Sequence, residues 1–93
     1  MIKSFKDPDT KQLFDGERVR QWQAIENIAR RKLVMVDAAA KLDDLKVPPN
    51  NKLHKLDKDR EGQYAISIND QYRICFEWKN GDTYYVEMTD YHS

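Results

Sequence analysis

The sequence has 93 residues, of which 40% are hydrophobic, and its 16 Lys and Arg residues are balanced by 16 Asp and Glu residues. This length leaves room for one hydrophobic core, so residues 1–93 are expected to form a single domain. No apolar run approaches the ~20 residues that span a bilayer. With one cysteine and no signal-peptide pattern, the sequence favours a cytoplasmic protein without a membrane partner.

The N-terminal half reads as helical. Residues 2–5 alternate like a short strand, and Asp7-Pro8 is a helix-start signal for a short helix that ends near Gly16. A longer helix is predicted from about residue 17 to 41, because apolar residues recur there every three or four positions: Trp22, Ile25, Ile28, Ala29, Leu33 and Val36.

Basic residues crowd the rest of that longer helix: Arg18, Arg20, Arg30, Arg31 and Lys32. One interpretation is an ordinary solvated helix face. The other is a docking surface for an acidic partner or for ribosomal RNA. Residues 47–51 then predict an extended connection, because Pro49 restricts Pro48 to extended geometry.

The C-terminal half predicts antiparallel strands. After a short strand within 52–56 and a charged loop at 57–62, alternating residues indicate strands near 64–68, 72–78 and 83–88. Asn80-Gly81 is a strong hairpin signal. The fold class is therefore α+β, with N-terminal helices packed on an antiparallel sheet.

Strand alternation makes a sharper prediction about the two faces of this sheet. If Ile74 and Phe76 face the helices with Tyr72 and Trp78, then Arg73 must point to the opposite face. On the last strand the same rule sends Val86 and Met88 inward, and Glu87 and Tyr91 outward.

Metal-independent RNA cleavage needs a base, a cation for the phosphorane and an acid. Residues of suitable type are His54, Arg73, Asp90, Tyr91 and His92, with phosphate contacts available from Lys52, Lys55 and Lys58. Each has an ordinary alternative: His54 can be an incidental exposed residue, and Arg73 can form a structural ion pair with Glu77 or Asp90. Cys75 is interpreted as a packed thiol, and neither a metal nor a cofactor site is expected.

Several segments resemble one known family. The opening Met1–Lys6, the Pro48–Asn51 segment, the stretch 59–76 and the terminal Asp90-Tyr91-His92 are all similar to HigB-type toxins (plasmid-maintenance killer proteins) of the RelE/ParE superfamily. The resemblance spans the chain. It implies helices packed against a curved antiparallel sheet whose concave side forms the active site.

The resemblance also implies a function: the toxin of a type II toxin-antitoxin system that inhibits translation as a ribosome-dependent mRNA endoribonuclease. His54 then matches a catalytic histidine, Arg73 the arginine at the scissile phosphate, and 90–92 a functional motif. Arg60 joins the lysines as an RNA-binding residue. The implied partners are the ribosome, mRNA and a HigA-type helix-turn-helix antitoxin, which alone would bring operator DNA.

Two points leave alternatives open. Some ribosome-dependent members carry a basic residue three positions after the histidine, where this chain has Asp57. The same fold also serves toxins that poison DNA gyrase by binding, and fold alone does not decide the target. A third reading is an attenuated toxin that acts mainly within the antitoxin complex.

Overall fold

The structure, a computed structural model, describes residues 1–90, so Tyr91 and His92 of the predicted site lie outside the described residues. In chain order the elements are α1 (Pro8–Phe14), a 3₁₀ helix (Arg20–Ile25), α2 (Glu26–Ala38), 3₁₀ turns (Leu42–Lys46 and Pro49–Asn51), β1 (His54–Lys55), a 3₁₀ turn (Lys58–Arg60), β2 (Gln63–Ser67), β3 (Tyr72–Lys79) and β4 (Asp82–Asp90). Within these residues no helix is long and apolar enough to cross a membrane.

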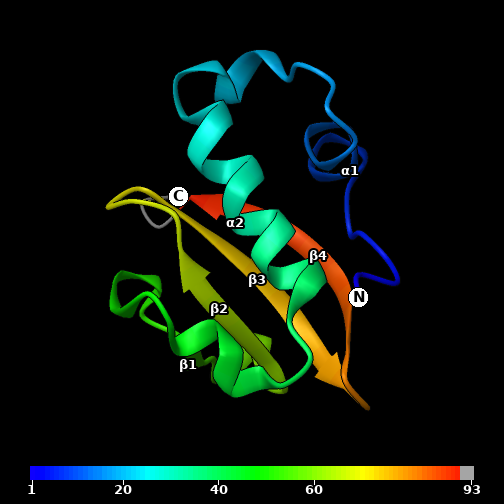
Figure 1. Cartoon of the computed structure of the whole chain (residues 1–93), viewed down its shortest axis with the longest axis vertical. Coiled ribbons are helices and arrows are strands. Elements are labelled where there is room, and N and C mark those ends of the chain that lie inside the picture. Colours follow the sequence, from blue (N-terminus) through cyan, green and yellow to red (C-terminus); the bar gives the residue numbers. More distant parts are fainter. Residues whose placement is uncertain (91–93) are drawn as a thin grey trace.

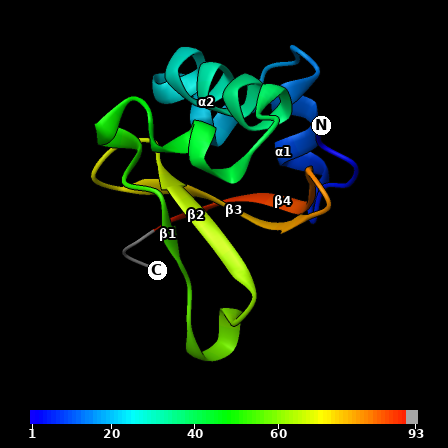
Figure 2. The same cartoon turned by 60° about the horizontal axis from the view of Figure 1, so that its bottom comes forward.

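The strands form one antiparallel sheet in the order β1-β2-β3-β4, and α1 and α2 lie on one of its faces (Figure 1). The predicted α+β fold, with helices packed on an antiparallel sheet, is confirmed. Asn80 and Gly81 both have positive φ, as the hairpin signal requires. Viewed along the sheet, β1 and β2 run away from the helices while β3 and β4 lie beneath them (Figure 2).

The start of the chain is tied to the edge strand β4. The Asp7 carboxylate accepts hydrogen bonds from the Thr10 backbone N–H and hydroxyl, which caps α1, and the Thr10 hydroxyl oxygen accepts one from the Met88 N–H. The strand expected at residues 2–5 is only a pair of isolated parallel bridges, at Ile2 and Phe5, to β4. Residues 1–6 therefore cover part of the outer edge of β4 without forming a regular strand.

The prediction of one helix from residue 17 to 41 was wrong at both ends. The backbone leaves helical geometry at Trp22 (φ −116°, ψ 15°) and at Ile25 (φ −116°, ψ 10°), so a 3₁₀ helix precedes α2. This bend lets Trp22 reach the core, where it is buried. At the other end, the Asp44 carboxylate accepts hydrogen bonds from the N–H groups of Ala40 and Lys41, which stabilises a new turn. Those hydrogen bonds hold the pKa of Asp44 below its ordinary value.

The core lies between α2 and the sheet, and the predicted alternation is confirmed there. Ile74, Phe76 and Val86 are fully buried together with Leu33 and Val36 of α2. Residues between these strand positions point to the opposite face.

The sheet bends at a β-bulge between β3 and β4. Cys75 pairs with Glu87 whereas Glu77 pairs with Tyr84, so β4 carries one extra residue opposite Phe76. Tyr85 takes up this extra position with φ 54° and is half exposed. A bulge of this kind bends and twists its strand, which accounts for the curvature that the family resemblance implied.

A buried lysine fixes the segment that enters β1. Lys32 of α2 is only 5% exposed, and its ammonium hydrogen-bonds the side-chain oxygens of Asn51 and, at 3.4 Å, Asn50. The Asn51 side-chain N–H group donates in turn to the carbonyl oxygens of Leu45 and Val47. Burial, and secondarily the charge of Arg31, holds the pKa of Lys32 below its ordinary value. The connection predicted as merely extended is therefore anchored to α2.

We expect Asn51→Ala to lower the free energy of unfolding by about 3 kcal/mol, because it leaves a buried ammonium and two backbone carbonyls without their partner. Urea unfolding followed by circular dichroism measures this change. The matched control is Asn50→Ala, at an exposed residue with one long contact, which we expect to cost under about 1 kcal/mol. Equal effects of the two variants would show that the buried contact between Lys32 and Asn51 contributes no more to stability than the exposed one.

Candidate functional site

The face of the sheet opposite the helices, which we call the open face, carries one row of residues across all four strands. His54 pairs with Ala65, Ala65 with Cys75, and Cys75 with Glu87. Directly opposed residues of antiparallel strands point to the same side, so these four side chains share the open face. Ala65 and Cys75 are small and fully buried, as expected for a packed thiol, and form the floor between His54 and Glu87.

A second row lies two residues along the strands and contains Arg73. Ser67 pairs with Arg73, and Arg73 with Thr89. The Arg73 Nε donates a hydrogen bond to the Thr89 hydroxyl at 3.2 Å, and that hydroxyl lies 3.5 Å from the Cys75 sulfur. The prediction that Arg73 leaves the helix-facing side is confirmed. Strand spacing and rise put the Cα atoms of His54 and Arg73 about 12 Å apart.

Arg60 reaches over the sheet to the far strand. Its guanidinium donates to the Gln63 side-chain oxygen on β2 at 3.2 Å and to Glu87 on β4 at 2.6 Å. The Glu87 side chain is 13% exposed and also lies 3.7 Å from the Lys6 ammonium. This carboxylate holds the pKa of Arg60 above its ordinary value. Both hydrogen bonds are made by the same Nη1 atom, which therefore lies between a β2 side chain and a β4 side chain, above β3, and helps to explain why Cys75 is buried.

His54 stands exposed on the short edge strand β1, and the backbone sets its tautomer. The His54 Nδ1 lies 2.8 Å from the carbonyl oxygen of Lys52, and Lys52 has positive φ (50°). A carbonyl only accepts hydrogen bonds, so this contact requires a proton on Nδ1. The Nε2 of a neutral His54 then carries the lone pair and is available to accept a proton.

The structure places the three predicted lysines differently. Lys52 and Lys58 are exposed and take positive φ on either side of β1. Lys55 pairs with Tyr64, whose ring packs against the core, so Lys55 lies on the opposite side of β1 from His54. Asp57 is exposed and precedes the turn that carries Lys58 and Arg60.

The C-terminal end of the predicted site is only partly described. Asp90 pairs with Tyr72 and therefore falls on the helix-facing side, while its neighbour Thr89 is on the open face. The Asp90 carboxylate accepts a hydrogen bond from the Gln71 side chain at 3.1 Å. The structure thus brings together His54, Arg60 and Arg73, but it does not direct Asp90 to the same side.

Sequence reasoning gave no role to Glu87 or Thr89, the residues that hold Arg60 and Arg73. Alternation had already placed Glu87 on the outward side of the last strand. What it did not show is the partner, because Arg60 is 27 residues away in the chain. The available signal was a carboxylate at an outward strand position, on the same sheet face as Arg73.

Comparisons with known proteins show the family to which the chain belongs. Residues 3–92 match the family model described as a RelE-like toxin of type II toxin-antitoxin system HigB. The chain belongs to this HigB family of type II toxin-antitoxin toxins. It is 36% identical to Endoribonuclease HigB of Proteus vulgaris over 99% of its own length and 100% of that protein. It is also 35% identical to Toxin HigB-1 of Vibrio cholerae, over 87% of each chain. Membership implies an antitoxin as partner.

We expect neutral His54 to populate the Nδ1–H tautomer several-fold over the Nε2–H tautomer, because a single hydrogen bond contributes about 1 kcal/mol. Long-range ¹H–¹⁵N spectra of the imidazole at pH 8 distinguish the two forms by their nitrogen shifts. A dominant Nε2–H form would mean that the contact with the Lys52 carbonyl does not persist in solution.

Proposed function

We propose that this HigB-family toxin is a ribosome-dependent endoribonuclease that cuts mRNA and so inhibits translation. The observation that carries the proposal is the shared open face of His54, Arg60 and Arg73. His54 and Arg73 there supply a proton acceptor and a cation for one phosphodiester, and Arg60 supplies a cation for a neighbouring phosphate. The full-length similarity to a protein named Endoribonuclease HigB supports the same reaction.

The proposed reaction is metal-independent attack by the RNA 2′-oxygen on the neighbouring phosphorus. The bond from the 2′-oxygen to phosphorus forms and the bond from phosphorus to the 5′-oxygen breaks, leaving a 2′,3′-cyclic phosphate and a 5′-hydroxyl. Nε2 of His54 takes the 2′-OH proton. Arg73 stabilises the charge that develops on the phosphorane oxygens, and its hydrogen bond to Thr89 orients it.

The remaining predicted residues take supporting roles in this proposal. The C-terminal motif, through Tyr91 or His92, supplies the proton to the leaving 5′-oxygen, and Asp90 is itself held by its hydrogen bond to Gln71. Lys52, Lys58 and Arg60 contact flanking phosphates. Lys55, on the other side of β1, reaches RNA only beyond the edge of the sheet.

The partners in this proposal are the ribosome, mRNA and a HigA-type helix-turn-helix antitoxin that alone contacts operator DNA. A protein with 16 basic and 16 acidic residues gains little affinity from counterion release on free RNA. Presentation of the mRNA by the ribosome removes the need for such affinity. This accounts for a nuclease with zero net charge.

Arg73→Ala should lower the rate of ribosome-dependent mRNA cleavage by 10²–10³-fold, because it removes a donor aimed at the transition-state charge. Primer extension on a defined mRNA, with and without programmed ribosomes, measures cleavage and its position. Arg20→Ala is the matched control, since Arg20 is an exposed arginine in the helical half of the chain, and it should cleave like the wild type.

Cleavage that proceeds equally without ribosomes would contradict the ribosome dependence. Complete absence of cleavage by the wild type would contradict the nuclease. A parallel gyrase supercoiling assay would then test the binding-toxin alternative, and growth without arrest on expression would indicate an attenuated toxin.

Glu87→Gln should tighten the binding of a short single-stranded RNA by about 3- to 10-fold; the RNA carries a 2′-deoxy sugar at the cleavage site so that it is not cut. The substitution keeps the shape of the side chain but removes the carboxylate, so the charge of Arg60 becomes available to a phosphate. Fluorescence anisotropy at several salt concentrations measures the affinity. The salt slope should steepen by about 0.7, one additional phosphate contact.

The matched control is Glu77→Gln. It removes an acid from the open face of the sheet, on β3, and leaves the ion pair between Arg60 and Glu87 intact. In the double variant Arg60→Ala with Glu87→Gln the gain should vanish. If Glu87→Gln binds RNA no better than the wild type, Glu87 does not compete with phosphate for Arg60.

A further inference from the structure

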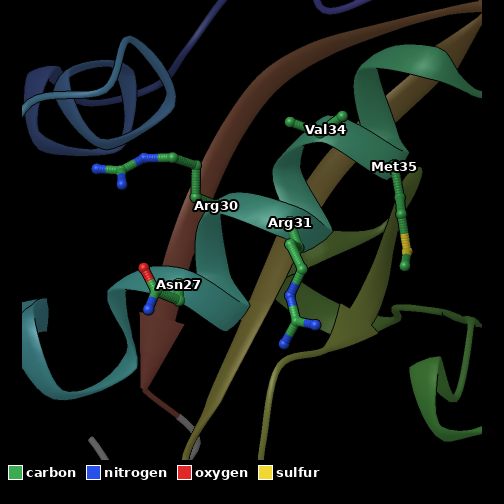
Figure 3. A pocket seen from close by; sticks show the side chains of 5 residues that line it. All are labelled: Asn27, Arg30, Arg31, Val34 and Met35. Atoms are coloured by element: carbon green, nitrogen blue, oxygen red, sulfur yellow. The ribbon is translucent and has the colours of Figure 1, made fainter.

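The outward side of α2 carries a shallow, mainly apolar groove that the proposed reaction does not use. It has a volume of about 520 Å³ and is lined by Asn27, Arg30, Arg31, Val34 and Met35. Val34 is 52% exposed, an unusual exposure for an aliphatic residue in the middle of a helix. In Figure 3, Arg30 and Arg31 extend to opposite sides of α2, with Val34 and Met35 one turn further along.

A second, smaller pocket of about 210 Å³ adjoins the groove. Arg31 and Met35 line both hollows, and the smaller one adds Ile28, Lys32, Pro48 and Asn50. From Asn27 to Met35 the helix rises about 12 Å, or two turns. We call the combined surface the α2 groove. Its length suits about two turns of a helix from another protein laid across it.

The α2 groove has positive charge without matching acids. Arg30 is already occupied, since it donates to the carbonyl oxygens of Leu13 and Glu17 and pairs with Glu26. Among residues 1–90, Arg31 makes no hydrogen bond or ion pair, and Lys32 bonds only to the amide oxygens of Asn50 and Asn51. A carboxylate from a partner would therefore find the exposed Arg31 without an acidic partner among the described residues, next to the buried charge of Lys32.

These features distinguish between possible occupants. An isologous dimer would bring Arg31 of one copy against the same patch of the other, and like charges would repel. RNA would find no aromatic ring among the lining residues on which a base could stack. A protein segment with an apolar side chain for Val34 and Met35 and an acidic one for Arg31 satisfies both halves of the surface.

We infer that the α2 groove is an anchor site for the antitoxin, which inserts an acidic, apolar segment with a carboxylate at Arg31 and an aliphatic or aromatic side chain over Val34 and Met35. A stable complex needs a larger interface, of roughly 1,200–2,000 Å², so the antitoxin contacts further surface as well. This docking does not depend on whether the chain cleaves RNA.

The test measures binding of the full-length toxin to the tagged product of the reading frame that adjoins its gene, by biolayer interferometry. Arg31→Glu and Val34→Glu should each weaken binding about tenfold or more, because one reverses the anchor charge and the other places an acid over the apolar floor. Arg20→Glu, an equal charge reversal outside the groove, should change the affinity less than threefold.

Circular dichroism and thermal unfolding show whether each variant is folded, and we expect all three to match the wild type. Unchanged antitoxin affinity of Arg31→Glu and Val34→Glu would overturn the inference, as would an equal loss in Arg20→Glu or a wild type that does not bind the product. Loss of ribosome-dependent cleavage by Arg31→Glu at unchanged antitoxin affinity would assign the groove to the ribosome instead. Altered self-association would assign it to a second copy.

Discussion

The alternation of side chains along β3 is the constraint on which both the core and the candidate site depend. Because β2 and β4 flank this strand, its register fixes theirs, and a slip by one residue would exchange the two faces. Ile74 and Phe76 are fully buried under α2, a strong reason for that register to hold. Arg73 and Cys75 are thereby directed to the open face. Burial of Ile74 and Phe76 in the core therefore positions the site residues that alternate with them along β3.

The charge distribution follows a second pattern: several cations are already engaged within the chain. Arg60 pairs with Glu87, which is also close to Lys6, and Arg30 is bound by carbonyls and Glu26. Such pairs contribute modestly to stability when partly exposed, but they keep guanidinium groups oriented. On the open face these ion pairs weaken the positive electrostatic potential that would attract free RNA. A nuclease that acts on a presented substrate needs orientation more than long-range attraction.

Much of this architecture was predictable because it follows from local rules. The cap at Asp7, the turn at Asn80-Gly81 and the faces of β3 and β4 all depend on residues close together in the chain. The helix prediction failed where tertiary packing overrode periodicity: the apolar spacing continued through Trp22, but burying that ring required a bend in the backbone. The periodicity of apolar residues predicts which residues are buried, but it does not predict whether they belong to one straight helix.

The partners of the site residues were less predictable, since they come from distant parts of the chain. From the sequence, Arg60 is expected to bind RNA and Glu87 to face outward, but nothing there shows that the sheet brings them within 2.6 Å. Asp90 shows the opposite case. The resemblance placed Asp90 in one site with the two residues that follow it. Strand alternation, however, sends Asp90 to the helix-facing side and its neighbour Thr89 to the open face.

Lys32 links the two sides of the molecule. It belongs to the basic set on α2, yet it is buried, and its ammonium holds Asn51, which lies shortly before β1 in the chain. Because β1 has only two residues and pairs on one side, its own ladder contributes little to fixing His54. The position of the proposed proton acceptor on the open face therefore depends on a contact made beneath α2. The basic run, interpreted from sequence either as a solvated face or as a docking surface, divides into two parts. Lys32 is an anchor for the fold, and Arg31 is an exposed cation that forms no ion pair among residues 1–90.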